Sequence, residues 1–145
     1  MHRSNSAERA IRTFRKHFKE VLATTDELSP MYLWCRLLSQ SCTTLDLMRN
    51  SKMNPKMSTE AQLNGAFYYN HTLLVPLGTK AIIHNNPGAR GTWYIQRTKG
   101  WYIGGAPKHY QFWTICVTKT AAEHVSDTVN FFHNSSNYRI YHQNY

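Results

Sequence analysis

The segment that decides the fold covers residues 76–132 and reads PLGTKAIIHNNPGARGTWYIQRTKGWYIGGAPKHYQFWTICVTKTAAEHVSDTVNFF. Its β-branched and aromatic residues gather in five runs, which are separated by turn residues such as those at 85–88 and Gly104-Gly105. The runs are TKAIIH, GTWYIQ, GWYIGG, HYQFWTICVTK and HVSDTVNFF. Short strands at such tight spacing predict a small five-stranded β-barrel.

Apolar residues recur at helical spacing before this segment. They form one stripe over residues 5–24, which predicts a first helix with Asn5 as its N-cap. A third, short helix is predicted over residues 58–63, and Gly65 ends it. Between these two, Ser29-Pro30 is typical of a helix start and predicts a second helix that ends near Asn50. Its predicted inward residues are Met31, Trp34, Leu38, Leu45 and Met48.

The fold class is therefore predicted to be α+β, with helices first and the barrel after them. We expect three regions: a helical part over residues 1–66, the barrel over residues 67–133, and a polar, flexible tail over residues 134–145. The helical part is small, so we expect it to depend on docking onto the barrel or onto a larger structure.

The charge of the chain favours a polyanionic partner. It has 17 Lys+Arg against 8 Asp+Glu, a formal net charge of +9, and no carboxylate lies between Glu60 and Glu123. Nucleic acid is the partner that this balance favours, although an anionic membrane surface also fits. No apolar run approaches the roughly 20 residues that span a bilayer, and no apolar leader opens the chain. We therefore expect an intracellular, soluble protein without a membrane partner.

Two groups of cations are candidates for contacting DNA. One is a basic face on the first helix, and the other lies in the loops NNPGARG and QRTKG of the β segment. The candidate residues are Arg9, Arg12, Lys16, Lys19, Arg90, Arg97 and Lys99. Neither group carries a base-reading pattern, so the predicted binding is independent of DNA sequence and falls steeply with salt. The alternative is that these cations only form a solvated surface.

Other side chains are expected to have structural roles. Glu8 stands three residues after Asn5, where it can complete a capping box and pair with Arg12. Cys35, Cys42 and Cys116 form no CxxC pair and are predicted to be buried, reduced thiols. The histidines lack metal-ligand spacing. At least half of seven barrel aromatics are expected to be buried: Trp93, Tyr94, Trp101, Tyr102, Tyr110, Phe112 and Trp113.

Several stretches in order resemble the integrases of copia-type retrotransposons. NSAERAIRTF is similar to the segment that carries the last glutamate of the catalytic triad, and residues 33–65 are similar to the helices that follow it. The β segment is similar to the small Src-homology-like (SH3-like) barrel of that family. The matching features are Pro76-x-Gly78, Ile82-Ile83-His84, Gly100-Trp101-Tyr102-Ile103-Gly104, Tyr110 and Asp127-Thr128-Val129-Asn130-Phe131.

This resemblance implies that residues 1–66 are the end of a ribonuclease-H-like catalytic core, and that Glu8 is a catalytic, metal-binding residue. The family uses Mg²⁺ or Mn²⁺ held by two upstream aspartates and the glutamate. Asp26, Asp46 and Asp127 match neither aspartate. We therefore expect an N-terminally truncated fragment involved in DNA integration, in which Glu8 is vestigial. The isolated chain is expected to hold no metal and to have no strand-transfer activity.

The resemblance also implies a nuclear location and an intact integrase as a partner in trans. Two other hypotheses stay open at this point. The aromatic barrel could bind a peptide or a modified lysine. The chain could also be a translated remnant without function.

Overall fold

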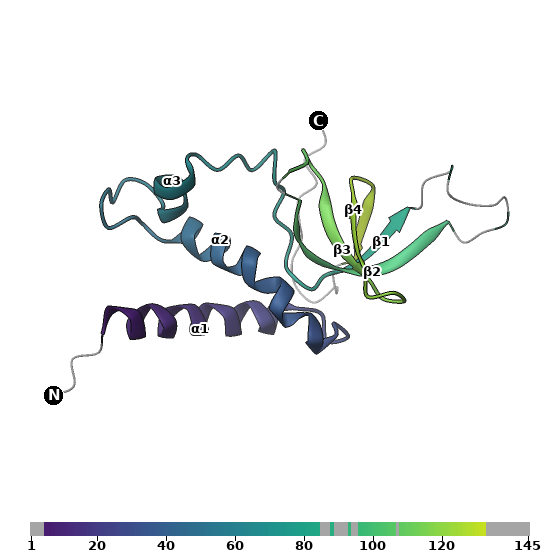
Figure 1. Ribbon diagram of the computed structural model, residues 1–145, viewed down its shortest axis with the longest axis horizontal. Helices are drawn as coiled ribbons and strands as arrows, with labels where there is room; N and C mark the ends of the chain where they lie inside the picture. The colour runs from purple at the N-terminus through teal and green to yellow at the C-terminus, as the bar shows by residue number, and fades with distance from the viewer. Residues whose placement is uncertain (1–4, 85–87, 89–92, 94–95, 107, 133–145) are drawn as a thin grey trace.

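The computed structural model describes residues 5–84, 88, 93, 96–106 and 108–132, in which helices precede an antiparallel sheet (Figure 1). The helical elements are α1 (Ser6–Thr24), the 3₁₀ helix η1 (Met31–Leu37), α2 (Leu38–Met48) and α3 (Thr59–Asn64). The strands are β1 (Lys80–His84), β2 (Arg97–Gly105), β3 (Trp113–Val117), β4 (Glu123–Ser126) and β5 (Val129–Phe132). The predicted α+β class is confirmed. The predicted tail, residues 134–145, lies outside the described residues.

The predicted bounds and N-cap of α1 are confirmed. The Asn5 side chain accepts a hydrogen bond from the backbone N–H of Ala7 at 3.4 Å, which caps the first turn. On the inner side, Phe18 and Val21 pack against the core, and a ring nitrogen of the buried His17 lies 3.1 Å from the carbonyl oxygen of Ser41 in α2. The second half of the apolar stripe therefore packs against the core and α2, whereas Ala7, Ala10 and Ile11 in its first half are exposed.

The second helix differs from its prediction. The chain after Pro30 first forms the 3₁₀ helix η1, and only Leu38–Met48 is α-helical. Leu33 and Leu37 are buried, whereas Met31, Trp34 and Met48 are exposed, so the predicted inward set is wrong at these three positions. A 3₁₀ helix advances about 120° per residue and an α-helix about 100°. Residues 31, 34 and 37 would therefore share one side of an ideal 3₁₀ helix, yet only Leu37 is buried, so helix geometry alone does not set the inward side of η1. The exposure of Met31 and Trp34 follows from how η1 docks through Leu33 and Leu37, and Met48 is exposed at the end of α2.

Helix α3 begins and ends as predicted. The Ser58 hydroxyl accepts a hydrogen bond from the N–H of Ala61 at 3.1 Å, and Gly65 adopts a φ of 86° just after the helix. A positive φ of this size costs glycine little, so Gly65 is suited to end α3.

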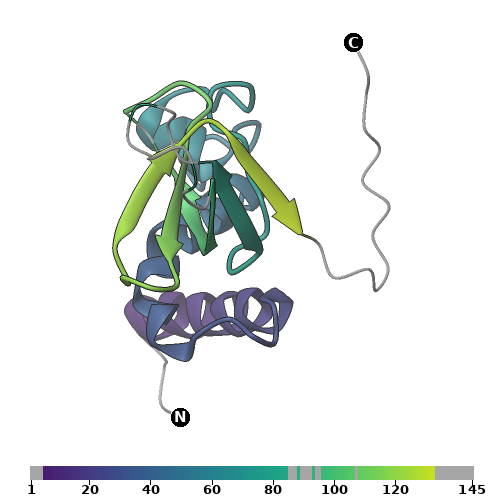
Figure 2. The ribbon, with the colours of Figure 1, turned by 90° about the vertical axis from the view of Figure 1, so that its right-hand side faces the viewer.

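The five strands form one antiparallel sheet in the order β4-β3-β2-β1-β5 (Figure 2). The last strand returns to pair with the first, but the two edge strands, β4 and β5, do not pair with each other. The sheet is therefore open as far as it is described, and a closed barrel is not established. The run HVSDTVNFF supplies both β4 and β5, because Asp127 and Thr128 interrupt it. In the predicted strand GTWYIQ, the two described residues, Trp93 and Gln96, are outside any strand.

The core joins the helices to the sheet. Leu33 and Leu37 belong to the same buried cluster as Trp101, Tyr102 and other sheet residues, and η1 contacts β2 directly. The Tyr102 hydroxyl donates a hydrogen bond to Oε1 of Gln40 in α2 at 2.8 Å. No helix within the described parts of the chain is long and apolar enough to span a bilayer.

Because of Tyr102, the stability of the contact between the helices and the sheet depends on pH in the alkaline range. Burial raises the pKa of Tyr102 to about 12, above its usual value near 10. Because burial disfavours the tyrosinate, the contribution of Tyr102 to stability is fully present below pH 10. We expect it to disappear as the pH rises through about 12, with a loss of roughly 2 to 3 kcal/mol.

Urea unfolding of the wild type and of Tyr102→Phe across this pH range measures the effect. The variant should be less stable by about 1 kcal/mol at pH 7, because it lacks the hydrogen bond to Gln40. It should lose less stability between pH 10 and 12 than the wild type does. Equal losses in the two proteins would contradict the assignment to Tyr102.

Candidate nucleic-acid interface

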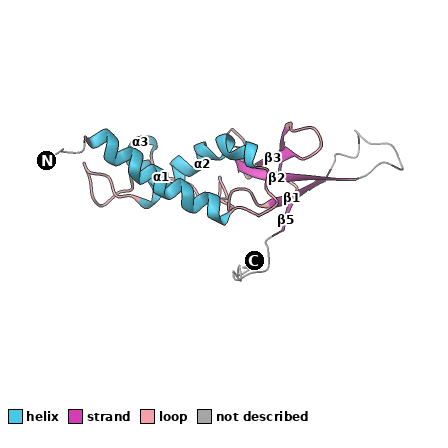
Figure 3. Cartoon of the chain, turned by 90° about the horizontal axis from the view of Figure 1, so that it is seen from below, coloured by secondary structure: helices cyan, strands magenta, loops and turns pink. Residues whose placement is uncertain are grey.

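Helix α1 carries four candidate cations on the side opposite to its buried face. Arg9, Arg12, Lys16 and Lys19 follow one another at intervals of three or four residues, so they lie along one side of the helix. All four are exposed. We call them the helix stripe. Figure 3 shows the molecule from below, where α1 runs along the helical part. From Arg9 to Lys19 the stripe extends about 15 Å at 1.5 Å per residue.

The sheet brings a second basic group together. Strand pairing places Arg97 opposite His84 and Lys99 opposite Ile82, so these side chains share one face of β1 and β2. Asn130 of β5 is also opposite Ile82, and its Nδ2 lies 3.0 Å from Nε2 of His84. We call His84, Arg97 and Lys99 the sheet patch.

Two of the sequence predictions are changed by this arrangement. Arg97 and Lys99 were expected in a loop, but they occupy the start of strand β2, with exposed side chains. Arg90, the third cation predicted for this region, lies outside the described residues. His84 was missed because its proximity to Arg97 depends on the register of β1 against β2, which a single sequence does not show.

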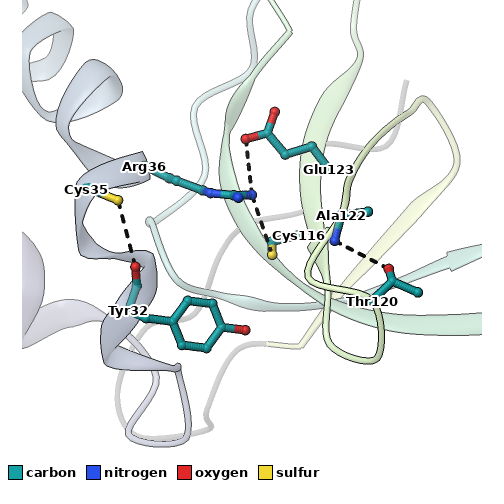
Figure 4. Close-up of polar contacts among 7 residues, drawn as sticks. All are labelled: Tyr32, Cys35, Arg36, Cys116, Thr120, Ala122 and Glu123. Atoms are coloured by element: carbon teal, nitrogen blue, oxygen red, sulfur yellow. Dashed lines mark hydrogen bonds and ion pairs between the residues drawn. The ribbon is translucent and has the colours of Figure 1, made fainter.

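Two carboxylates lie in or beside the strands. Asp127 is exposed next to Thr128, whose carbonyl oxygen accepts a hydrogen bond from the N–H of His84 at 3.4 Å. Glu123 is the only carboxylate in the five strands, and its Oε1 lies 3.2 Å from Nη1 of Arg36 in η1 (Figure 4). This is the single ion pair among the described residues. Because both side chains are partly exposed, it contributes little to stability.

Arg36 also connects η1 to a buried thiol. Its Nη1 lies 3.9 Å from Sγ of Cys116, as Figure 4 shows. Burial raises the pKa of the Cys116 thiol, so this cysteine is protonated at neutral pH. All three cysteines are free, but the predicted burial is correct only for Cys116 and wrong for Cys35 and Cys42, which are exposed on the helical elements. Cys35 lies on the outward side of η1, and Cys42 lies on the outward side of α2.

Glu8 is exposed in the first turn of α1, where the helix dipole favours a carboxylate. Asn5 caps the helix as predicted. However, the Glu8 side chain forms no hydrogen bond or ion pair with any described residue, so neither the capping-box bond nor the pair with Arg12 is seen.

The described residues do not fit a two-metal site of the integrase type. Such a site needs several hard oxygen ligands that converge on each cation. Nowhere in the described ranges do three or more His, Cys, Asp or Glu side chains cluster in a way that could hold a metal ion. Asp26 instead accepts a hydrogen bond from the N–H of Leu28 at 2.9 Å, a local turn contact. Glu8 alone offers no basis for deriving strand transfer.

Comparison with known proteins returns no similarity. No protein-family model matches the chain, and no curated protein and no solved structure matches it. The site is therefore interpreted from its own geometry and charge.

The aromatic residues divide between core and surface. Of the six described rings, Trp101 and Tyr102 are buried, and Phe112 and Trp113 are partly buried. Trp93 and Tyr110 are exposed, while Tyr94 lies outside the described residues. Buried rings cannot enclose a ligand cation, so an aromatic cage built on Trp101 and Tyr102 is excluded.

Proposed function

We propose that this chain binds duplex DNA through the helix stripe and the sheet patch, without reading base sequence. One observation carries the proposal: all six described candidate cations are exposed, and none forms an ion pair with a described carboxylate. Such cations can replace the counterions of DNA phosphates, and release of those counterions is favourable at low salt.

We further propose that the chain is part of a copia-type integrase, with nuclear DNA as its ligand and an intact integrase as a partner. The order of helices followed by a five-stranded sheet supports this proposal. The return of β5 to β1 supports an SH3-like barrel, because it lets the sheet curl around Ile83, Tyr102 and Ile115. Exposed apolar side chains on the helices, such as Trp34 and Met48, fit a surface on which more of a catalytic core packs.

Within this proposal the 145 residues contribute binding and no complete catalytic site. Mg²⁺ or Mn²⁺ would need two further carboxylates from outside these residues. Glu8 is placed at an exposed helix start, where a metal and a phosphate could reach it. That position fits the proposed vestigial role but supplies no chemistry by itself.

The sheet patch is tested by removing its two permanent charges. Arg97→Gln with Lys99→Gln should weaken binding to a duplex by roughly 10- to 100-fold at 0.1 M salt, because two phosphate contacts are lost. The loss should be equal on two duplexes of unrelated sequence. Fluorescence anisotropy with labelled duplexes measures both affinities.

The matched control is Lys52→Gln with Lys56→Gln. It removes the same charge from two exposed positions between α2 and α3. If the control weakens binding as much as the patch variant does, net charge rather than the patch explains the affinity. That result would contradict the proposal.

A further inference from the structure

Aromatic side chains, three of them exposed and two half-buried, gather where the segment between α3 and β1 meets the β2–β3 connection. They are Phe67, Tyr68, Tyr69, His71 and Tyr110, which we call the aromatic ledge. Tyr68, Tyr69 and Tyr110 are 75%, 59% and 58% exposed. The rings of Phe67 and Tyr69 meet edge to face at 4.8 Å between centroids, and those of His71 and Tyr110 do so at 5.4 Å. The basic surfaces described above include none of these residues.

The ledge is held in place by Gln111. Its backbone N–H donates to the carbonyl oxygen of His71 at 3.0 Å, and its Nε2 donates to that of Asn70 at 3.1 Å. The same Nε2 lies 3.4 Å from the Tyr110 hydroxyl. Gln111 has a φ of 55°, an uncommon conformation that persists only where surrounding contacts fix it. The rings are thus presented from two chain segments that are bonded together.

The charge beside the exposed ring of Tyr110 is positive. Lys108 and His109 are exposed on the same connection as Tyr110, and no carboxylate occurs between Glu60 and Glu123 in the sequence. Both acids line a pocket with Phe67, where Glu60 accepts a hydrogen bond from Asn64 and Glu123 pairs with Arg36. The exposed rings of Tyr68, Tyr69 and Tyr110 do not line this pocket. A site for a basic peptide or a modified lysine would need acids beside its rings. An aromatic surface with cations instead suits bases and phosphates.

We infer that the aromatic ledge binds unpaired bases of single-stranded nucleic acid by stacking. This inference rests on the proposed function and extends it, because the stripe and the patch contact phosphates whereas the ledge would contact bases. Paired bases inside a duplex keep their faces covered by their neighbours. The ledge therefore distinguishes a single-stranded end or gap from the intact duplex beside it.

The test compares two 12-nucleotide probes that carry the same phosphates: oligo(dT) and an abasic strand of equal length. The wild-type protein should bind oligo(dT) at least about five-fold more tightly than the abasic strand, the lower end of what stacking on one ring gives. Tyr68→Ala, Tyr69→Ala and Tyr110→Ala together should remove this preference. The same three positions changed to Phe keep the rings and should retain it.

The other possible results of this test separate the ledge inference from the proposed function. If oligo(dT) and the abasic strand bind equally while duplex binding still falls with salt, the ledge inference is wrong and the proposed function stands. If the protein binds neither single-stranded probe nor duplex DNA, both are wrong. Displacement of oligo(dT) by a proline-rich peptide, with loss of peptide binding in the alanine variant, would assign the ledge to a protein partner. Circular dichroism confirms that the variants are folded.

Discussion

Replacing Arg12, Lys16 and Lys19 together with glutamine is expected to weaken duplex binding by roughly 100- to 1,000-fold at 0.1 M salt. Each phosphate contact contributes about 0.9 to the slope of log K against log salt concentration, so three lost contacts lower that slope by about 2.7. All three side chains are exposed on the side of α1 opposite to the buried His17, so the helix itself should be retained. Anisotropy titrations at several salt concentrations measure the affinity and the slope together.

The matched control changes Arg49, Lys52 and Lys56 to glutamine. These residues are also exposed, and the change removes the same three charges from another part of the helical region. We expect a loss below about five-fold and a slope close to that of the wild type, because only diffuse attraction is reduced. Equal slopes for the stripe variant and the wild type would exclude α1 from the interface.

Gly100→Ala is expected to cause the largest loss of stability, about 3 kcal/mol or more. Gly100 is buried in β2, and a Cβ at this position would lie 2.5 Å from Cγ2 of Ile115 and 2.6 Å from the carbonyl oxygen of Cys116. The second obstacle is backbone of the paired strand β3, which cannot move without disturbing the ladder. Overpacking of this kind typically costs 1 to 3 kcal/mol, and more where the backbone is the obstacle.

Thermal unfolding measures the effect, with an expected fall in Tm of about 10 °C. Two other glycines act as controls. At Gly105 the obstacle is a Thr72 methyl group at 2.8 Å, which can rotate away, so Gly105→Ala should cost less. A Cβ added at Gly88 would meet no atom within 4 Å, so Gly88→Ala should be close to neutral. If all three variants unfolded at the same temperature, the close packing of Gly100 in β2 against β3 would be contradicted.

Local signals predicted much of the helical part. Asn5 and Ser58 are caps whose side chains bond to the next turn, and Gly65 ends α3, so these boundaries followed from the sequence. The 3₁₀ geometry of η1 did not, because no residue after Pro30 distinguishes it from an α-helix. The outward position of Trp34 follows from how η1 docks through Leu33 and Leu37, and Met48 is exposed at the end of α2. Docking depends on tertiary contacts, which the periodicity of the sequence does not show.

The candidate interface was predicted in part. The helix stripe could be found because one α-helix determines which of its side chains share a side. The sheet patch could not, since the pairing of Arg97 with His84 depends on strand register. The aromatic ledge was missed for a similar reason. Its sequence signal, Phe67-Tyr68-Tyr69, lies before the β segment, and only the hydrogen bonds of Gln111 bring Tyr110 beside it.

The central claim is that exposed, unpaired cations bind the DNA backbone. Its most direct measurement is the affinity of the wild-type protein for two duplexes of unrelated sequence between 50 and about 300 mM salt, a range over which phosphate contacts weaken strongly. We predict that log K falls linearly with log salt concentration, with a slope of about −4 or steeper that is the same for both duplexes. An affinity that does not change with salt, or that differs widely between the two sequences, would contradict the claim.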